Sequence, residues 1–342
     1  MTDSSDLAEI GLLIYPGAQL AAIYGLTDLF AIASDLAQEK AGQEKDSGGK
    51  SHSDRPILRV SHWQPDEVSQ AISCCHDTHP QQPHQPVFLL IPPSLIGPPT
   101  AEMTTRLATW LTQQHAGGVV LGSVCAGAFL LAETGLLAGR PATTHWSYAE
   151  TFAACFPEIG TDTDKLIIDD GDIITAGGLM AWIDLGLKVV ARLLGPTIAL
   201  ETARYLLVDP AGREQRFYSS FSPRLLHGDK AVLKVQHWLQ SQGTRNVTLT
   251  DMATQAGLEE RTFLRRFQKA TGLKPTEYCQ HLCIEKARER LEFSKLPVEQ
   301  VAWSVGYEDA GAFRKVFQKV MGLSPGDYRR RFAVGSVEPT AK

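Results

Sequence analysis

A cysteine and a histidine are the first residues in this sequence that could do chemistry together. Cys125 lies in the run Gly122-Ser123-Val124-Cys125-Ala126-Gly127, between an apolar strand-like run and a helical stretch over 129–137, so the pattern predicts a sharp strand-to-helix elbow. A helix N-terminus favours a thiolate there. His145, twenty residues further on, is a candidate base if the fold brings the two side chains together.

Three roles for Cys125 stay open at this stage: lining a ligand pocket, a redox-sensitive thiol, or a nucleophile. His145 is either a hydrogen-bonding pocket residue or a base, and Trp146 is either a pocket wall or core. Ligands on parallel sheets bind beyond the carboxyl ends of the strands, which points to the loops 17–20 and 123–127. The expected ligand-binding residues are Gly17, Gln19, Leu20, Cys125, Ala126, His145 and Trp146.

A repeat near the C-terminal end predicts a different activity. The offset is 49 residues at its first glycine and 50 from the first phenylalanine onward. Each copy is typical of a helix, a tight turn and a second helix, which makes double-stranded DNA the first partner to consider. The residues Gly257, Phe263, Phe267-Gln268-Lys269, Gly272-Leu273, Pro275 and Tyr278 return as Gly306, Phe313, Phe317-Gln318-Lys319, Gly322-Leu323, Pro325 and Tyr328.

Helical periodicity places the repeated phenylalanines on a core face and basic residues on the opposite face of each second helix. An arginine at such a position can bind guanine O6 and N7, whereas marginal basic residues neutralise phosphate. Arg265 and Thr262 are the expected base readers of the first copy, and Gly311 makes the second less discriminating. The expected DNA-binding residues are Arg261, Thr262, Arg265, Arg266, Lys269, Gly311, Arg314, Lys315 and Gln318.

The elements around these helices are also readable. Thr248 and Asp251 have the spacing of a capping box, so residues 249–255 are expected to form the supporting helix. Glu259 is expected at the N-cap of the first recognition helix. An uninterrupted helical pattern over 276–293, about 27 Å long, would hold the two motifs at a spacing that suits successive major grooves.

Charge is divided unevenly along the chain. The formal net charge is −5, but residues 228–332 carry 18 Lys and Arg against 12 Asp and Glu, while the remainder has 15 against 26. A basic module joined to an acidic one is typical of a DNA reader with a partner domain that avoids phosphate. The alternative, two ordinary core helices with solvated charges, does not account for the repeat.

The other patterns bound the kind of protein. The N-terminal ten residues lack a basic and apolar leader, and no apolar run approaches a membrane span, so a cytoplasmic location is expected. The six cysteines show no framework spacing. Cys74-Cys75-His76 with His79 and His84 raises a metal site, but a second ordered ligand pair is missing. No metal or cofactor is therefore expected, and the polar segment 38–56 is expected to be a mobile insertion.

Strand-like and helix-like runs alternate in the first part of the chain. Strand-like runs cover 10–15, 87–91 and 119–124, and helix-like runs cover 20–36 and 101–115. This order predicts an α/β domain with a largely parallel, flavodoxin-like sheet, followed by an all-α domain with two helix-turn-helix motifs. Two further helices over 182–194 and 196–208 carry apolar stripes, one of which is a candidate dimer contact.

Residues 229–332 resemble the DNA-binding domain of the AraC/XylS regulators, on the repeated motifs given above. Residues 8–210 resemble the class I glutamine amidotransferase-like domain on Tyr15-Pro16-Gly17, the elbow, residues 140–146, Asp170-Gly171 and Thr175-Ala176-Gly177-Gly178. The combination, with a linker at 211–228, is the layout of GlxA-like regulators. The resemblance implies a homodimeric transcription factor, usually an activator that contacts RNA polymerase, with a small-molecule effector such as an amino acid or a quaternary amine.

The resemblance also bears on catalysis. Hydrolytic or deglycase-like members of the amidotransferase-like family have an acidic residue after the first strand, and Leu20 stands at that position here. Without that carboxylate, Cys125 and His145 lack the group that would orient them for acyl transfer. The expected protein is a regulator with no catalytic residues, and the alternative is a cysteine-dependent amidase or deglycase that retains a DNA-binding domain.

Overall fold

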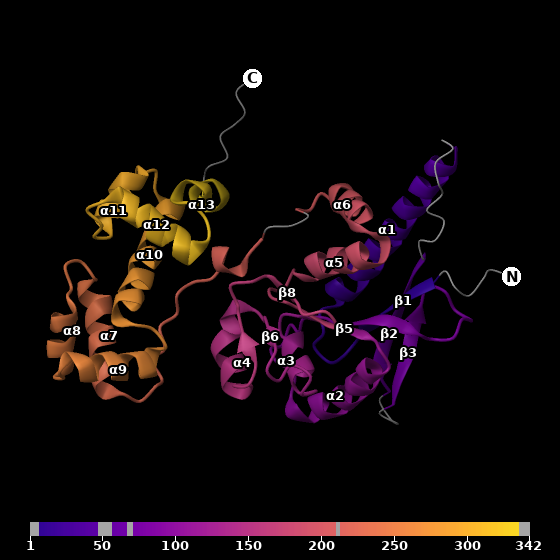
Figure 1. The fold of residues 1–342 in the computed structure, drawn as a ribbon, viewed down its shortest axis with the longest axis horizontal. Helices are drawn as coiled ribbons and strands as arrows, with labels where there is room; N and C mark the ends of the chain where they lie inside the picture. Colours follow the sequence, from indigo (N-terminus) through magenta and orange to yellow (C-terminus); the bar gives the residue numbers. More distant parts are fainter. Residues whose placement is uncertain (1–6, 47–56, 67–70, 210–212, 335–342) are drawn as a thin grey trace, which may run out of the picture. The chain divides into compact units, whose positions relative to one another are not determined.

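A computed structural model of the chain describes residues 7–46, 57–66, 71–209 and 213–334. The chain divides into two compact units, residues 1–215 and 216–342 (Figure 1). The first unit is an α/β domain and the second is entirely helical. The fold class expected from the sequence is therefore confirmed, and each unit is described by itself below.

A seven-stranded sheet forms the centre of the first unit. Neighbouring strands at its middle are parallel, and the two outermost pairs are antiparallel. The second strand of the chain lies on one side of the first strand, and the fourth and fifth strands continue the sheet on the other side, so strand order reverses next to the first strand. Beyond the fifth strand, the ninth strand precedes the eighth. The strands lie in the order β3 (Ile72–Asp77), β2 (Ile57–Pro65), β1 (Leu7–Leu13), β4 (Pro86–Ile91), β5 (Val120–Val124), β9 (Ile173–Ala176) and β8 (Ile167–Asp169).

Helices cover both faces of this sheet (Figure 1). One layer consists of α1 (Leu20–Asp46), α5 (Trp182–Leu194) and α6 (Pro196–Tyr205), which contact one another. The other contains α2 (Ala101–Ala116) and the short α3 (Gly127–Ala132). Smaller elements follow α3: β6 (Pro141–Ala142), α4 (Ala149–Cys155) and β7 (Gly160–Thr161).

The first helix differs from the expectation at its C-terminal end. It continues to Asp46, so the first nine residues of the segment 38–56, which was expected to be mobile, are helical, and residues 47–56 lie outside the described residues. Residues 20–42 are also long and apolar enough to cross a membrane by length and composition, contrary to the sequence expectation. In this structure Ile23, Leu26 and Phe30 are at most 1% exposed within the core of the first unit, which explains the apolar composition.

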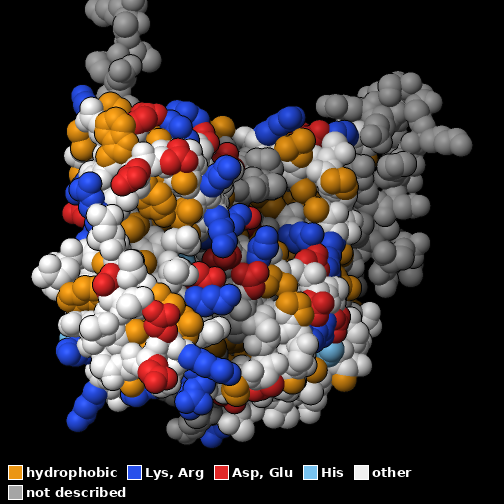
Figure 2. All heavy atoms as spheres, turned by 60° about the vertical axis from the view of Figure 1, so that its left-hand side comes forward, with side chains coloured by type: hydrophobic (Ala, Val, Ile, Leu, Met, Phe, Trp, Pro, Cys, Tyr) orange, Lys and Arg blue, Asp and Glu red, His pale blue; other side chains and the backbone are white. Residues whose placement is uncertain are grey.

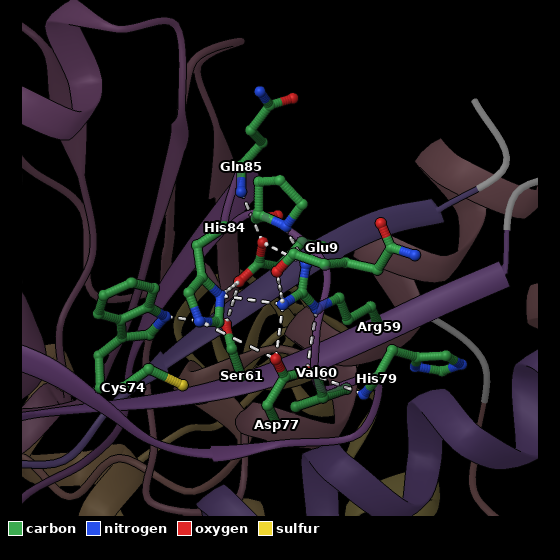
Figure 3. Close-up of polar contacts among 12 residues, drawn as sticks. Glu9, Arg59, Val60, Ser61, Cys74, Asp77, His79, His84 and Gln85 are labelled. Atoms are coloured by element: carbon green, nitrogen blue, oxygen red, sulfur yellow. Dashed lines mark hydrogen bonds and ion pairs between the residues drawn. The ribbon is translucent and has the colours of Figure 1, made fainter. Parts of the chain in front are cut away.

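A buried charge network ties the amino-terminal ends of β1 and β2 to the segment before β4 (Figure 3). The Arg59 guanidinium donates to both Asp77 oxygens, at 3.0 and 2.5 Å, and holds the pKa of that carboxyl below its usual range. Glu9 accepts from Ser61 Oγ at 2.6 Å and contacts His84 Nδ1 at 2.8 Å. These groups satisfy one another's hydrogen-bonding capacity at the amino-terminal ends of β1 and β2, whereas the elbow follows the carboxyl end of β5. His84 therefore has a structural role there.

The second unit contains two small cores, one for each copy of the repeat. Phe263, Phe267 and Tyr278 belong to the first, and Phe313, Phe317 and Tyr328 occupy the equivalent places in the second. The helix α10 (Pro275–Phe293) contributes to both cores and connects them. The seven helices are α7 (Lys230–Gln242), α8 (Leu249–Ala256), α9 (Glu260–Thr271), α10 (Pro275–Phe293), α11 (Val298–Ser304), α12 (Ala310–Met321) and α13 (Pro325–Phe332).

Several local expectations for this unit are confirmed. Thr248 and Asp251 form the capping box that begins α8, and Glu259 is the N-cap of α9 without a side-chain cap bond. Gly272 and Gly322 end the two recognition helices with φ of 78° and 75°, the left-handed region where glycine is favoured. The helix α10 has 19 residues, about 28 Å at 1.5 Å per residue.

Candidate functional site

The recognition helix of the first motif, α9, has one buried face and one exposed basic face. Phe263 and Phe267 have no exposed surface, whereas Arg261, Arg265 and Lys269 are exposed. The hydroxyl-bearing Thr262 is partly exposed beside them. No ion pair within the described part of the chain engages Arg265, so its guanidinium is available to a partner.

The second motif repeats this arrangement in α12. Arg314, Lys315 and Gln318 are exposed, and Gly311 is partly exposed in the first turn, where Asp309 caps the helix by accepting from the Gly311 and Ala312 amides. Arg314 pairs with Glu299 of α11, while the described residues provide no ion-pair partner for Lys315. Figure 2 shows Lys and Arg side chains distributed over the face of the helical unit that the view brings forward.

Arg266 differs from the other basic residues of α9. Its guanidinium donates two hydrogen bonds to Asp229, from Nε at 2.8 Å and from a terminal nitrogen at 2.7 Å. Asp229 also caps α7 by accepting from the Ala231 and Val232 amides. A groove of about 790 Å³ lies beside this pair, lined by His227, Gly228, Asp229, Lys230, Arg265, Arg266, Lys269 and Ala270. Arg266 therefore anchors α9 to α7 and contributes to a mainly basic groove.

The predicted elbow is present in the first unit. Cys125 lies between β5 and α3 with φ of 55°, and the residue is only 3% exposed. Burial raises the pKa of Cys125 to about 11, and a hydrogen bond from the Ala126 amide offsets this only in part. The expectation of a thiolate was therefore wrong, because α3 has only six residues and the cost of desolvating the charge dominates.

His145 lies near the elbow but is engaged elsewhere. Its Nδ1 accepts from the Ser147 amide at 3.1 Å and lies 2.7 Å from Ser147 Oγ, and burial lowers the pKa of the imidazole. Among the described residues no hydrogen bond joins it to Cys125. The contact between the two segments comes from Thr144, whose hydroxyl donates to the Cys125 carbonyl oxygen at 2.8 Å. Trp146 is partly buried, with its ring 5.4 Å from that of His145.

The other predicted ligand residues follow β1. Gly17 has φ of 84°, and a Cβ there would overlap Ile96. Gln19 is 7% exposed; its Nε2 lies 4.0 Å from Met180 Sδ, and its Oε1 has no hydrogen-bond partner among the described residues. Leu20, in contrast, is 53% exposed, so it is not enclosed by this unit.

Three further residues at the elbow were missed by the sequence analysis. Tyr15 is buried and donates to the Pro92 carbonyl at 2.6 Å, and the pKa of its phenol is raised by burial and by nearby Cys125. Ser123 is fully buried with no partner for its Oγ in the described residues. Gln215 hydrogen-bonds the segment 143–146 from within the expected linker. Tyr15 and Ser123 lie within the motifs Tyr15-Pro16-Gly17 and Gly122 to Gly127, so the sequence could have indicated them. No motif contains Gln215.

Comparison with known proteins agrees with this geometry. A family model described as a helix-turn-helix domain matches residues 252–331, and the DJ-1/PfpI family model matches residues 69–192. The HTH-type transcriptional regulator CdhR of Pseudomonas aeruginosa is 28% identical over 234 residues, covering 68% of this chain and 69% of that protein. The HTH-type transcriptional regulator GlxA of Rhizobium meliloti is 28% identical over 232 residues, covering 67% and 70%.

A solved structure, a putative transcriptional regulator from Vibrio parahaemolyticus, is 19% identical and has a TM-score of 0.45 over 58% of this chain and 98% of its own. The fold and the paired motifs define a two-domain DNA-binding regulator. The chain carries a DJ-1/PfpI domain followed by an AraC-type helix-turn-helix domain, and it is a transcriptional regulator similar to GlxA and CdhR.

Proposed function

We propose that the protein activates transcription in the cytoplasm when a small metabolite binds beside the elbow of its first unit. It would act as a homodimer on promoter DNA and contact RNA polymerase. Exposed Leu200 and Tyr205 on α6 support self-association through that helix layer. The observation that carries the proposal is the pair of matching recognition helices, each with a buried aromatic face and an exposed basic face.

The base-reading assignment is that Arg265 and Thr262 of the first motif contact bases, while its marginal basic residues Arg261, Arg266 and Lys269 contact phosphate. In the second motif, the residues nearest the DNA are Gly311, Arg314, Lys315 and Gln318. Exposure of Arg265 without an ion pair supports its role as a bidentate guanine reader. Binding to a DNA fragment selected in vitro from a random pool tests this. Arg265→Ala should weaken binding by about 1–3 kcal/mol and relax one base preference. Unchanged affinity and selectivity for that variant at stringent salt would exclude the assignment.

The effector site is assigned to Gly17, Gln19, Leu20, Cys125, Ala126, His145 and Trp146. Buried polar atoms are nearly always hydrogen-bonded, so the unpartnered Gln19 Oε1 supports a ligand that donates there. An amino acid ammonium donates hydrogen bonds and a quaternary amine does not, which favours the amino acid.

Calorimetric titration with the twenty amino acids, and with betaine as the quaternary amine, tests this assignment. One amino acid should bind, and Gln19→Leu should weaken that binding by about 1–3 kcal/mol. Betaine binding that Gln19→Leu leaves intact would contradict it.

Catalysis is not part of the proposal. A neutral thiol is a poor nucleophile, and the high pKa of Cys125 keeps it neutral at physiological pH. His145 is directed to Ser147, and exposed Leu20 supplies no carboxylate. The competing amidase or deglycase function predicts turnover of an amide or glycated substrate that disappears in Cys125→Ser. Detecting such turnover would overturn the non-enzyme assignment.

A further inference from the structure

The side-chain amide of Gln215 is buried in the first unit, and both its nitrogen and its oxygen are hydrogen-bonded. Gln215 is 2% exposed, and the two hydrogens of its Nε2 are shared among three acceptors, Thr143 Oγ1 at 3.0 Å and the carbonyl oxygens of Thr144 and Lys165 at 2.8 and 2.9 Å. Its Oε1 accepts from the Trp146 amide at 3.0 Å. The fit is close, because a Cβ on Gly177 would lie 1.8 Å from Gln215 Nε2. One amide therefore holds the segment 143–146 in place.

The segment held by Gln215 is the one that contacts the elbow. The carbonyl oxygen of Thr144 accepts from Gln215, and the Thr144 hydroxyl donates to the Cys125 carbonyl oxygen at 2.8 Å. His145 and Trp146, both assigned to the effector site, follow directly. Displacing the Gln215 side chain would leave the Trp146 amide without its acceptor and release the backbone on which these residues stand.

The residues that follow Gln215 in the chain are held by the second unit. We name residues 216–228 the strap. Its middle is bound to α10: Arg288 donates to the Ser219 carbonyl at 2.6 Å, and the Phe221 amide donates to Glu285 at 3.2 Å. The Phe221 ring stacks on His281 and meets Tyr278 edge-on, with centroids 4.9 and 5.2 Å apart.

Both ends of the strap contact helices of the second unit. At its start, Arg216 and Phe217 lie beside Gly322, which ends the recognition helix α12. At its end, Gln236 of α7 donates to the Arg224 carbonyl at 2.9 Å and contacts His227 Nε2 at 2.8 Å. Along its length the strap is thus bound by the end of α12, by α10 and by α7 within the helical unit.

We propose that Gln215 is a positioning residue that couples the effector-site segment 143–146 to the strap of the DNA-binding unit. Covalent continuity supplies the link, since Gln215 and Arg216 are consecutive residues in one 3-10 turn over Gln215–Phe217. A movement of the segment that expels the Gln215 amide frees the start of the strap. Release of the strap in turn weakens the hold of Gln215 on the Trp146 amide. The inference rests on the proposed effector site, whose regulation it specifies.

Hydrogen exchange of the full-length protein, resolved to single amides by mass spectrometry, tests this coupling without DNA or effector. The Trp146 amide is the reporter because its acceptor is Gln215 Oε1. Arg288→Ala and Phe221→Ala each loosen the strap by removing a different contact. Each should raise the exchange rate of the Trp146 amide roughly three- to tenfold, the range expected for weakening one hydrogen bond. Lys286→Ala, an exposed basic residue on the same helix, is the matched control and should leave it unchanged.

A double-substitution cycle separates coupling from general loosening. Gln215→Met keeps the length of the side chain, removes its hydrogen bonds and should raise Trp146 exchange by itself. Adding Arg288→Ala to Gln215→Met should then have no further effect on Trp146. If either strap variant speeds exchange of strap amides but leaves Trp146 at the wild-type rate, the coupling is refuted, whether or not Gln215→Met folds. That result would leave the DNA-binding and effector proposals intact.

Discussion

Arg266 and Asp229 form a two-point ion pair that fixes the first recognition helix to the N-terminus of α7. The adjacent Arg265 is exposed and unpaired among the described residues. Two neighbouring arginines of one helix therefore have different roles. Sequence spacing placed both on the basic face, and only the contact with Asp229 separates them.

This difference predicts opposite phenotypes for the two alanine variants. Arg266→Ala should lower the free energy of unfolding only modestly, since the pair is partly exposed to solvent. Arg265→Ala should leave stability within about 0.5 kcal/mol of wild type but weaken DNA binding more than Arg266→Ala does. Urea unfolding and DNA titration of the same two preparations measure both effects. Equal stability losses would show that the ion pair does not anchor the helix.

The equivalent glycines that end the recognition helices provide a second test. Gly272→Ala places a Cβ in open space and should cost only the left-handed strain, about 1–2 kcal/mol of unfolding free energy. Gly322→Ala carries the same strain, and its Cβ would also lie 2.4 Å from Arg216 and 2.7 Å from Phe217 of the strap. It should therefore be the more destabilising in thermal unfolding. Equal losses for the two variants would place the strap away from α12.

The helical unit was largely readable from the sequence because its signals are local and occur twice. Phe263 and Phe313 recur with glycines and prolines at matched distances, and periodicity alone distinguishes the buried from the exposed face. The role of Arg266 was missed because Asp229 is 37 residues away in the sequence. No sequence pattern relates Arg266 to Asp229.

The α/β unit was readable in outline, but the sheet strands β2, β3, β8 and β9 and one contact were missed. The strand β2 escaped because polar Arg59, Ser61 and His62 are buried with its apolar residues, so alternation does not mark a single core face. Gln215 escaped because one glutamine in a segment with the composition of a linker carries no pattern. Its role appears only when the fold brings Thr143 and Lys165 together around it.

Buried His62 makes stability depend on pH. Its Nε2 lies 2.9 Å from the Thr27 hydroxyl, which itself donates to the Ile23 carbonyl and so accepts from neutral His62. Burial and the nearby His76 lower the pKa of His62 to about 4. Because the folded pKa lies below the unfolded value of about 6.5, this stabilisation is present above pH 6.5 and is lost as the pH falls toward 4.

The His62→Gln variant keeps a donor for Thr27 and does not titrate. Between pH 6.5 and 4 the wild type should lose roughly 1–3 kcal/mol of unfolding free energy relative to this variant. Urea unfolding at a series of pH values measures the difference. Parallel curves for the two proteins would mean that His62 keeps its ordinary pKa in the folded state.

The neutral state of Cys125 is directly measurable. With a pKa of about 11, its thiolate fraction at pH 8 is on the order of a hundredfold below that of an unperturbed cysteine. Iodoacetamide labelling followed by peptide mapping should therefore modify exposed Cys155 long before Cys125. The Cys125 rate should rise steeply above pH 10 and match that of other cysteines in denaturant. Rapid labelling of folded protein at pH 7 would instead restore the case for a reactive thiolate.

Methylation protection of guanine N7 on a DNA fragment selected by the full-length protein tests the paired recognition helices most directly. The proposed arrangement predicts, for each protein chain, two clusters of protected guanines about one helical turn apart on one face of the duplex. Arg265→Ala should abolish protection in one cluster, and Lys315→Ala should weaken binding while both clusters persist. A single cluster per chain, or protection that survives Arg265→Ala unchanged, would contradict the insertion of two recognition helices into successive major grooves.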